Sequence, residues 1–148
     1  MSTPPTEVFR RYLSAMVLNS LATAEAAGLN ATDYYTLNLL DLSGPLTSGE
    51  LAVRTGLTTG ATTRLIDRLE KAGHVRRVPD PADRRKVIVE ATGQLAGLDE
   101  VLAGTRRRIG ELLGSYSDDE LATLFDYFRR AATAYTEATD ELIGARQG

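Results

Sequence analysis

The sequence of 148 residues contains no cysteine and a single histidine, His74. The absence of cysteine excludes a disulfide framework, a thiolate metal site and a cysteine redox switch. One histidine also argues against a metal or catalytic centre built from several histidines. No apolar run reaches the roughly 18 residues that a membrane-spanning helix needs, and residues 1–5 lack the basic and apolar regions of a signal peptide. We therefore expect a cytoplasmic protein without a metal or cofactor.

Positive charge is in slight deficit overall, with a formal net charge of −3, but it is concentrated in the middle of the chain. Residues 47–92 carry nine Lys/Arg and six Asp/Glu, a net charge of +3, whereas the remaining residues carry eight and fourteen, a net charge of −6. A basic segment between acidic flanks indicates a localised contact with a polyanion. Chance clustering of surface charge is the alternative.

Hydrophobic spacing predicts a mainly helical chain, and the length is typical of a single domain over residues 1–148. Apolar residues at three- and four-residue steps predict helices over 6–27, 31–43, 48–55, 59–72 and 95–113, with a last helix after Ser117. Two β-branched runs, 74–78 and 86–90, predict a two-stranded β-hairpin around a Pro/Asp turn. The predicted order is three helices and a hairpin between long flanking helices.

The two short helices before the hairpin have the spacing of a helix-turn-helix. Thr47 and Glu50 fit a capping box at the start of the first of them. Gly56 allows a sharp turn, and Thr58 is a good N-cap for the second helix. With the hairpin, this order predicts a winged helix-turn-helix. Its second helix can enter a major groove of DNA and its wing can reach the adjacent minor groove.

The wing contains the run Asp80-Pro81-Ala82-Asp83-Arg84-Arg85, and the helix before it contains the run 63–73. Together with Glu50-Leu51-Ala52, these residues resemble the MarR family of bacterial transcription regulators. The sequence departs from that family's pattern at Thr62, where an apolar residue is usual. It also departs at 91–93, where Ala-Thr replaces Leu-Thr and a glycine follows at once.

The resemblance implies a homodimeric repressor that binds a pseudo-palindromic operator in double-stranded DNA and is released by a small aromatic or anionic ligand. It implies dimerisation helices at 6–30 and 93–145, around a winged-helix lobe at 31–92. Independently, the wide apolar stripe of 6–27 and the aromatic stripe of 121–142 need a partner surface. Two recognition helices about 34 Å apart would meet successive major grooves.

The candidate DNA-binding residues on the second helix of the motif are Thr58, Thr59, Thr63, Arg64 and Arg68. Thr58 caps the helix, contacts DNA, or does both. Arg64 faces outward, where it either donates twice to a guanine or remains solvated. Arg68 lies one turn further along, and we expect it to bind a phosphate or an internal carboxylate.

The candidate DNA-binding residues on the wing are Asp83, Arg84, Arg85 and Lys86. The resemblance implies that Arg85 enters the minor groove and that Asp83 orients it. We expect Arg84 and Lys86 to contact phosphates. An exposed charged turn without a DNA contact is the alternative.

Other polar and aromatic residues have two interpretations each. The resemblance implies a ligand pocket that Tyr34 or Tyr35 would line, with Tyr12 or Met16 opposite. Ordinary core packing is the alternative for these side chains. His74 is either a sensor of pH or ligand, or a structural residue. Strand alternation turns one of the neighbouring pair 76–77 inward, without indicating which.

Three further functions compete with a ligand-released repressor associated with the nucleoid. A protein of the same fold could bind DNA as a ligand-independent architectural protein, or could use the winged helix for protein contacts alone. An enzyme is disfavoured, because the sequence has no Gly-rich cofactor loop, no nucleophile and base around His74, and no metal-ligand cluster.

Overall fold

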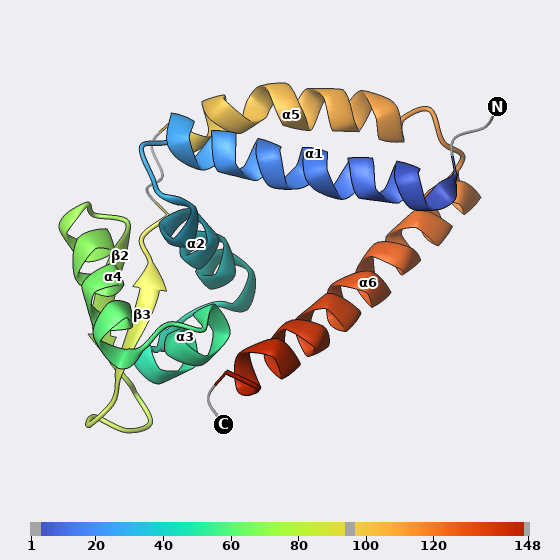
Figure 1. The fold of residues 1–148 in the computed structure, drawn as a ribbon. Coiled ribbons are helices and arrows are strands. Elements are labelled where there is room, and N and C mark those ends of the chain that lie inside the picture. Colours follow the sequence, from blue (N-terminus) through green and yellow to red (C-terminus); the bar gives the residue numbers. More distant parts are fainter. Residues whose placement is uncertain (1–3, 94–96, 147–148) are drawn as a thin grey trace. The chain divides into compact units, whose positions relative to one another are not determined.

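The structure is a computed structural model that describes residues 4–93 and 97–146 (Figure 1). Its helices are α1 (Pro5–Ala26), α2 (Ala31–Ser43), α3 (Ser48–Thr55), α4 (Thr59–Lys71), α5 (Leu98–Leu113) and α6 (Asp118–Gly144). Its strands are β1 (Leu46–Thr47), β2 (Val75–Pro79) and β3 (Val87–Ala91). This order confirms the predicted mainly α fold with a winged helix-turn-helix. The expected first residues of the helix 95–113 lie partly outside the described residues.

The chain divides into two units, Met1–Leu102 and Ala103–Gly148, and the boundary falls within α5. The first unit contains α1, α2 and the winged helix-turn-helix. The second contains most of α5 and all of α6. The single domain expected from chain length stays a prediction.

The hairpin belongs to a three-stranded antiparallel sheet with the strand order β1-β3-β2. In the hairpin, Val75 lies opposite Ala91 and Pro79 opposite Val87. The sequence prediction missed β1, in which Leu46 pairs with Val89. A strand of two residues is too short to show alternation, yet it covers the free edge of β3 and so protects it from pairing with another chain.

Side-chain caps fix the turn between α3 and α4. The Thr47 hydroxyl accepts from the Glu50 backbone N–H at 3.2 Å, and the Glu50 carboxylate accepts from the Thr47 backbone N–H at 2.7 Å. Gly56 ends α3 in the left-handed region with φ 68°, which favours glycine. The Thr58 hydroxyl then accepts from the Ala61 backbone N–H, so both predicted caps are confirmed.

The hydrophobic core lies within the winged-helix lobe. Its buried members come from α2, α3, α4 and the sheet: Leu37, Leu40, Leu46, Leu51, Leu65, Ile66, Leu69, Val75 and Val89. Thr62 is buried beside them, and its hydroxyl donates to the Thr58 carbonyl at 2.9 Å. This hydrogen bond satisfies the buried hydroxyl, so a polar residue is tolerated where the resemblance leads one to expect an apolar one.

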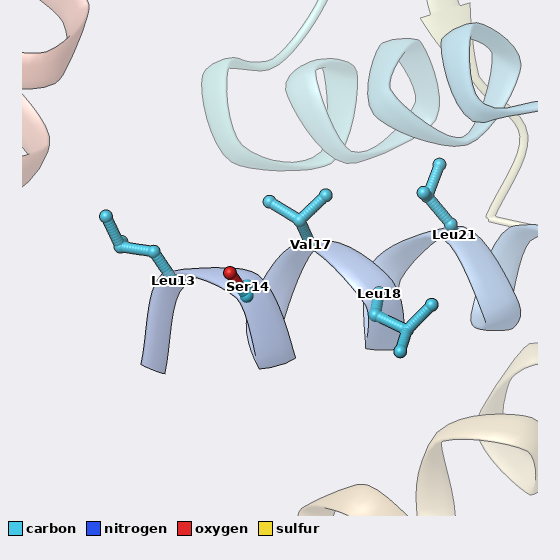
Figure 2. Close-up of a pocket in the computed structure, with 5 residues that line it drawn as sticks. All are labelled: Leu13, Ser14, Val17, Leu18 and Leu21. Carbon is cyan, nitrogen blue, oxygen red and sulfur yellow. The ribbon is translucent and has the colours of Figure 1, made fainter. Parts of the chain in front are cut away.

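The long helices leave large apolar side chains exposed. In α1 only Thr23 and Ala24 are buried, and no residue of α6 within Asp118–Gly144 is buried. Figure 2 shows a hollow on α1 where Leu13, Val17 and Leu21 point to one side and Leu18 to another. Within residues 4–93 and 97–146, no helix combines the length and hydropathy needed to cross a bilayer.

The exposed apolar residues of α1 are Val8, Phe9, Tyr12, Met16, Val17, Leu18 and Leu21, and those of α6 are Phe125, Tyr127, Phe128, Tyr135 and Leu142. Several large apolar side chains exposed on one helix are typical of a protein–protein interface.

Candidate nucleic-acid interface

Helix α4 has one buried and one exposed face, as the sequence pattern predicts. Thr62, Leu65, Ile66 and Leu69 are buried. The candidate DNA-binding residues of its N-terminal half are exposed: Thr58, Thr59, Thr63 and Arg64. The Thr63 hydroxyl donates to the Thr59 carbonyl at 3.0 Å. The exposed N-terminal half is thus free to enter a groove while the other face anchors the helix to the core.

Arg64 and Arg68 have different surroundings on this helix. Arg64 has no ion pair with any described residue, so its guanidinium is available to a ligand outside the chain. Arg68 donates through Nε to Asp33 Oδ2 at 2.8 Å and through Nη2 to Asp33 Oδ1 at 2.5 Å. These hydrogen bonds raise the pKa of Arg68. The sequence predicted either a phosphate or an internal carboxylate as the partner of Arg68, and in the structure the partner is the internal carboxylate of Asp33.

Two aspartates order the wing loop between β2 and β3. The Asp80 carboxylate accepts from the Ala82 backbone N–H at 2.8 Å, and the Asp83 carboxylate accepts from the Arg85 backbone N–H at 3.0 Å. The loop closes where the Asp80 N–H donates to the Lys86 carbonyl. Asp83 therefore orients the backbone at Arg85, and its effect on the Arg85 side chain stays a prediction.

The tip of the wing carries three consecutive cations, Arg84, Arg85 and Lys86, all of them exposed. Among the residues that the structure describes, none of the three side chains pairs with a carboxylate. No described carboxylate therefore neutralises their charge, which leaves it available for a phosphate contact or for an arginine in the minor groove. The contacts expected for these three side chains stay predictions.

The arginines of β2 are both engaged within the protein. Arg76 pairs with Glu90 across the hairpin, with 63% of its side chain exposed. Arg77 has 30% of its side chain exposed, and it donates to Asp67 at 2.6 Å and to Glu70 at 2.7 Å. The hydrogen bond to Asp67, followed by that to Glu70, raises the pKa of Arg77. Strand alternation did not indicate which of Arg76 and Arg77 is structural, and the structure shows that it is Arg77.

A cavity of about 250 Å³ lies between α1 and α2. Its lining residues are Met16, Val17, Ser20, Leu21, Ala31, Tyr34, Tyr35 and Asn38. Three of the four expected pocket residues line it, whereas Tyr12, one turn before Met16, does not. Tyr35 is 49% exposed, so the core-packing alternative does not describe it.

Asp33 and His74 each have a feature that only the structure reveals. Asp33 was missed, because an acidic residue in the first turn of a helix is ordinary and its partner lies far along the chain. His74 has a buried Nδ1 with no hydrogen-bond partner among the described residues.

Known proteins resemble this chain over most of its length. A model described as MarR family matches residues 27–86. The uncharacterized HTH-type transcriptional regulator YcgE of Bacillus subtilis is 38% identical over 137 residues, which cover 92% of this chain and 89% of YcgE. The transcriptional activatory protein BadR of Rhodopseudomonas palustris is 33% identical, over 80% of this chain and 72% of BadR.

The fold also matches solved structures. The crystal structure of a MepR mutant from a multidrug-resistant clinical isolate of Staphylococcus aureus aligns with a TM-score of 0.73 at 18% identity, over 91% of this chain and 99% of MepR. The two relatives are named as transcriptional regulators, not as enzymes. The chain therefore belongs to the MarR family, as a transcription regulator with a winged-helix DNA-binding fold.

Proposed function

We propose that the protein is a homodimeric, cytoplasmic and nucleoid-associated repressor that binds a pseudo-palindromic operator and releases it when a small aromatic or anionic molecule binds between α1 and α2. The observation that carries the proposal is that some cationic side chains on α4 and the wing lack carboxylate partners among the described residues. Arg64 on α4 and Arg84, Arg85 and Lys86 on the wing are exposed and have no carboxylate partner among the described residues. Positive charge is thus free on the two elements that reach the grooves of DNA.

The exposed faces of the long helices support the dimer. Leu18 is 68% exposed on α1 and Phe125 is 54% exposed on α6. Exposing an apolar side chain to water is unfavourable. Burying each of them against a second copy would contribute about 1.5–3 kcal/mol to the free energy of dimerisation. A two-fold dimer would also present two copies of α4, which is what a pseudo-palindromic site requires.

The cavity between α1 and α2 supports the effector. Its lining residues are mostly aromatic and aliphatic, with Ser20 and Asn38 as the polar ones. This lining suits a small aromatic molecule that carries a polar or anionic group. Ligand release requires the molecule to bind the DNA-free conformation more tightly than the DNA-bound one.

Repression follows from steric occupation of a promoter by the bound dimer. A relative of this chain is named a transcriptional activatory protein, so activation is the opposite outcome to test. A reporter fused to the bound promoter is expected to rise when the gene for this protein is deleted. A fall in reporter output would overturn repression and leave DNA binding intact.

Selection of genomic fragments by the full-length protein, followed by titration of a selected duplex at two salt concentrations, tests the proposal. The wild type is expected to bind as a dimer, with an affinity that falls as salt rises. Arg85→Ala is expected to weaken binding about tenfold, within the range for one lost DNA contact. Arg10→Ala removes an exposed cation from α1 and is the matched control, with binding unchanged.

The alternatives predict different results in the same experiment. An architectural protein would bind the selected and the unrelated duplex equally and would not respond to small phenolic compounds. A protein-interaction module would bind neither duplex, and Arg85→Ala would change nothing.

A further inference from the structure

Asp33 is a buried carboxylate outside the helix-turn-helix, yet it is bonded to the recognition helix α4. Its side chain is 5% exposed, and both of its oxygens accept from the guanidinium of Arg68. The two parallel hydrogen bonds make a fork that fixes direction as well as distance. Arg68 is 35 residues away in sequence, so the contact is purely tertiary.

This fork is a directional link between α2 and α4. In the part of the chain that the structure describes, no other side-chain hydrogen bond or ion pair joins these two helices. Both helices also contribute to the apolar core, with Leu37 from α2 and Leu65 from α4, but apolar burial is non-directional, whereas a bidentate hydrogen bond fixes direction.

The acceptor is itself held in place. The Asp33 backbone N–H donates to the side chain of Asn30, the N-cap of α2, at 2.8 Å. The carboxylate lies in the first turn of α2, where the helix dipole favours negative charge. The fork therefore begins from a rigid turn, so a displacement of that turn would be transmitted to Arg68.

Arg68 and Arg64 are four residues apart and share one side of α4. Both line the same hollow beside α2, together with Asn30 and Thr32. A bond that fixes the rotation of α4 about its own axis at Arg68 thus also fixes the direction in which the unpaired Arg64 side chain points from the helix. A bidentate contact with a guanine tolerates little error in that direction.

We propose that Asp33 is a positioning residue for DNA recognition, which sets the rotation of the recognition helix through Arg68 and so governs base selection by Arg64. This role rests on the proposed DNA-binding function. Asp33 offsets the charge of Arg68, so Asp33→Asn raises the net charge of the lobe by one and should strengthen the general attraction to phosphates on every duplex alike. The positioning role is therefore measured as the ratio of operator to unrelated affinity, from which this general attraction cancels.

The experiment compares the full-length wild type with Asp33→Asn, Arg68→Lys and the double variant. Arg68→Lys keeps the charge but cannot form the fork. Asp41→Asn removes an exposed carboxylate from the same helix and is the matched control. Dissociation constants are measured for a selected operator and for an unrelated duplex at two salt concentrations, and the melting temperature of each variant is recorded.

Both single variants are expected to lose about tenfold in the ratio of operator to unrelated affinity, the size of one charge-assisted hydrogen-bond pair. The double variant should lose no more than either single variant, since one fork is broken in each. Asp41→Asn should keep the wild-type ratio.

Three results would overturn the positioning role. Tighter binding of Asp33→Asn to both duplexes at an unchanged ratio, with Arg68→Lys unchanged, would make Arg68 a phosphate contact that Asp33 restrains. A lower melting temperature with an unchanged ratio would make the pair a stabilising contact only. A wild type that prefers no duplex would overturn the proposed function itself, and the positioning role with it.

Discussion

Arg77 on β2 is bonded twice to Glu70 on α4: its backbone N–H donates to one carboxylate oxygen at 3.2 Å and its guanidinium donates to the other at 2.7 Å. The same guanidinium donates to Asp67 at 2.6 Å. One residue thus connects the first strand of the wing to the recognition helix. The two elements that we expect to contact DNA are held to each other by it, so their relative angle depends on this cluster.

Arg77→Ala is expected to lower the free energy of unfolding by about 1–2 kcal/mol, because two carboxylates lose a partly buried partner. Urea denaturation followed by far-UV circular dichroism measures the change. Arg76→Ala is the matched control on the same strand. It loses one exposed pair with Glu90 and should cost less than about 1 kcal/mol. An equal loss in the two variants would contradict the role assigned to Arg77.

The stabilisation by Arg77 should not change between neutral pH and pH of about 10. Its pKa is raised, chiefly by the hydrogen bond to Asp67, above a value that is already higher than any in this range. A raised pKa gives stability that is fully present below the unfolded-state pKa and is lost only above it. The difference in unfolding free energy between wild type and Arg77→Ala should therefore be flat over this interval. A steady decline toward alkaline pH would show that another group titrates in the cluster.

The lobe could be predicted from the sequence because its signals are local. Capping residues such as Thr47 and Thr58 act within three residues of themselves, and the apolar period of α4 is read directly from its spacing. The hairpin followed from two β-branched runs and a Pro/Asp turn, and its strands begin one residue later than expected.

What the sequence did not predict is non-local. The partners of Arg68 and Arg77 lie 35 and 7–10 residues away, and nothing in the local pattern distinguishes a paired arginine from a free one. Candidate residues could be named from their positions, whereas their partners required the fold.

Arg64 and Arg84 are expected to affect DNA binding in different ways. Arg64→Ala should lower the affinity for the selected operator about tenfold and leave the affinity for unrelated DNA nearly unchanged, because a base contact is lost. Arg84→Ala should weaken binding to both and reduce the salt slope by about one, because a phosphate contact is lost. Titrations of both duplexes at several salt concentrations separate the two patterns. Identical behaviour of the variants would contradict the assignment of base contact to Arg64.

Leu18→Glu is expected to weaken the proposed dimer, because it places a charge on the exposed apolar face of α1. Analytical ultracentrifugation should show a monomer at concentrations where the wild type is dimeric, with the helical circular dichroism retained. Leu42→Glu is the matched control, since Leu42 is 87% exposed at the end of α2 and lies outside the proposed dimer face. Dissociation by both variants, or by neither, would argue against α1 as the dimer interface.

Ser20→Leu is expected to abolish the response to a small phenolic acid by filling the cavity between α1 and α2, which Ser20 lines. The cavity of about 250 Å³ is small, so the larger side chain removes much of the space for an aromatic ring. The measurement is the operator affinity of each protein with and without the acid. Ala22→Leu enlarges an exposed residue of the same helix that does not line the cavity, and it should respond as the wild type does. A response that survives in Ser20→Leu would place the effector elsewhere, whereas its loss in both variants would point to the helix surface instead of the cavity.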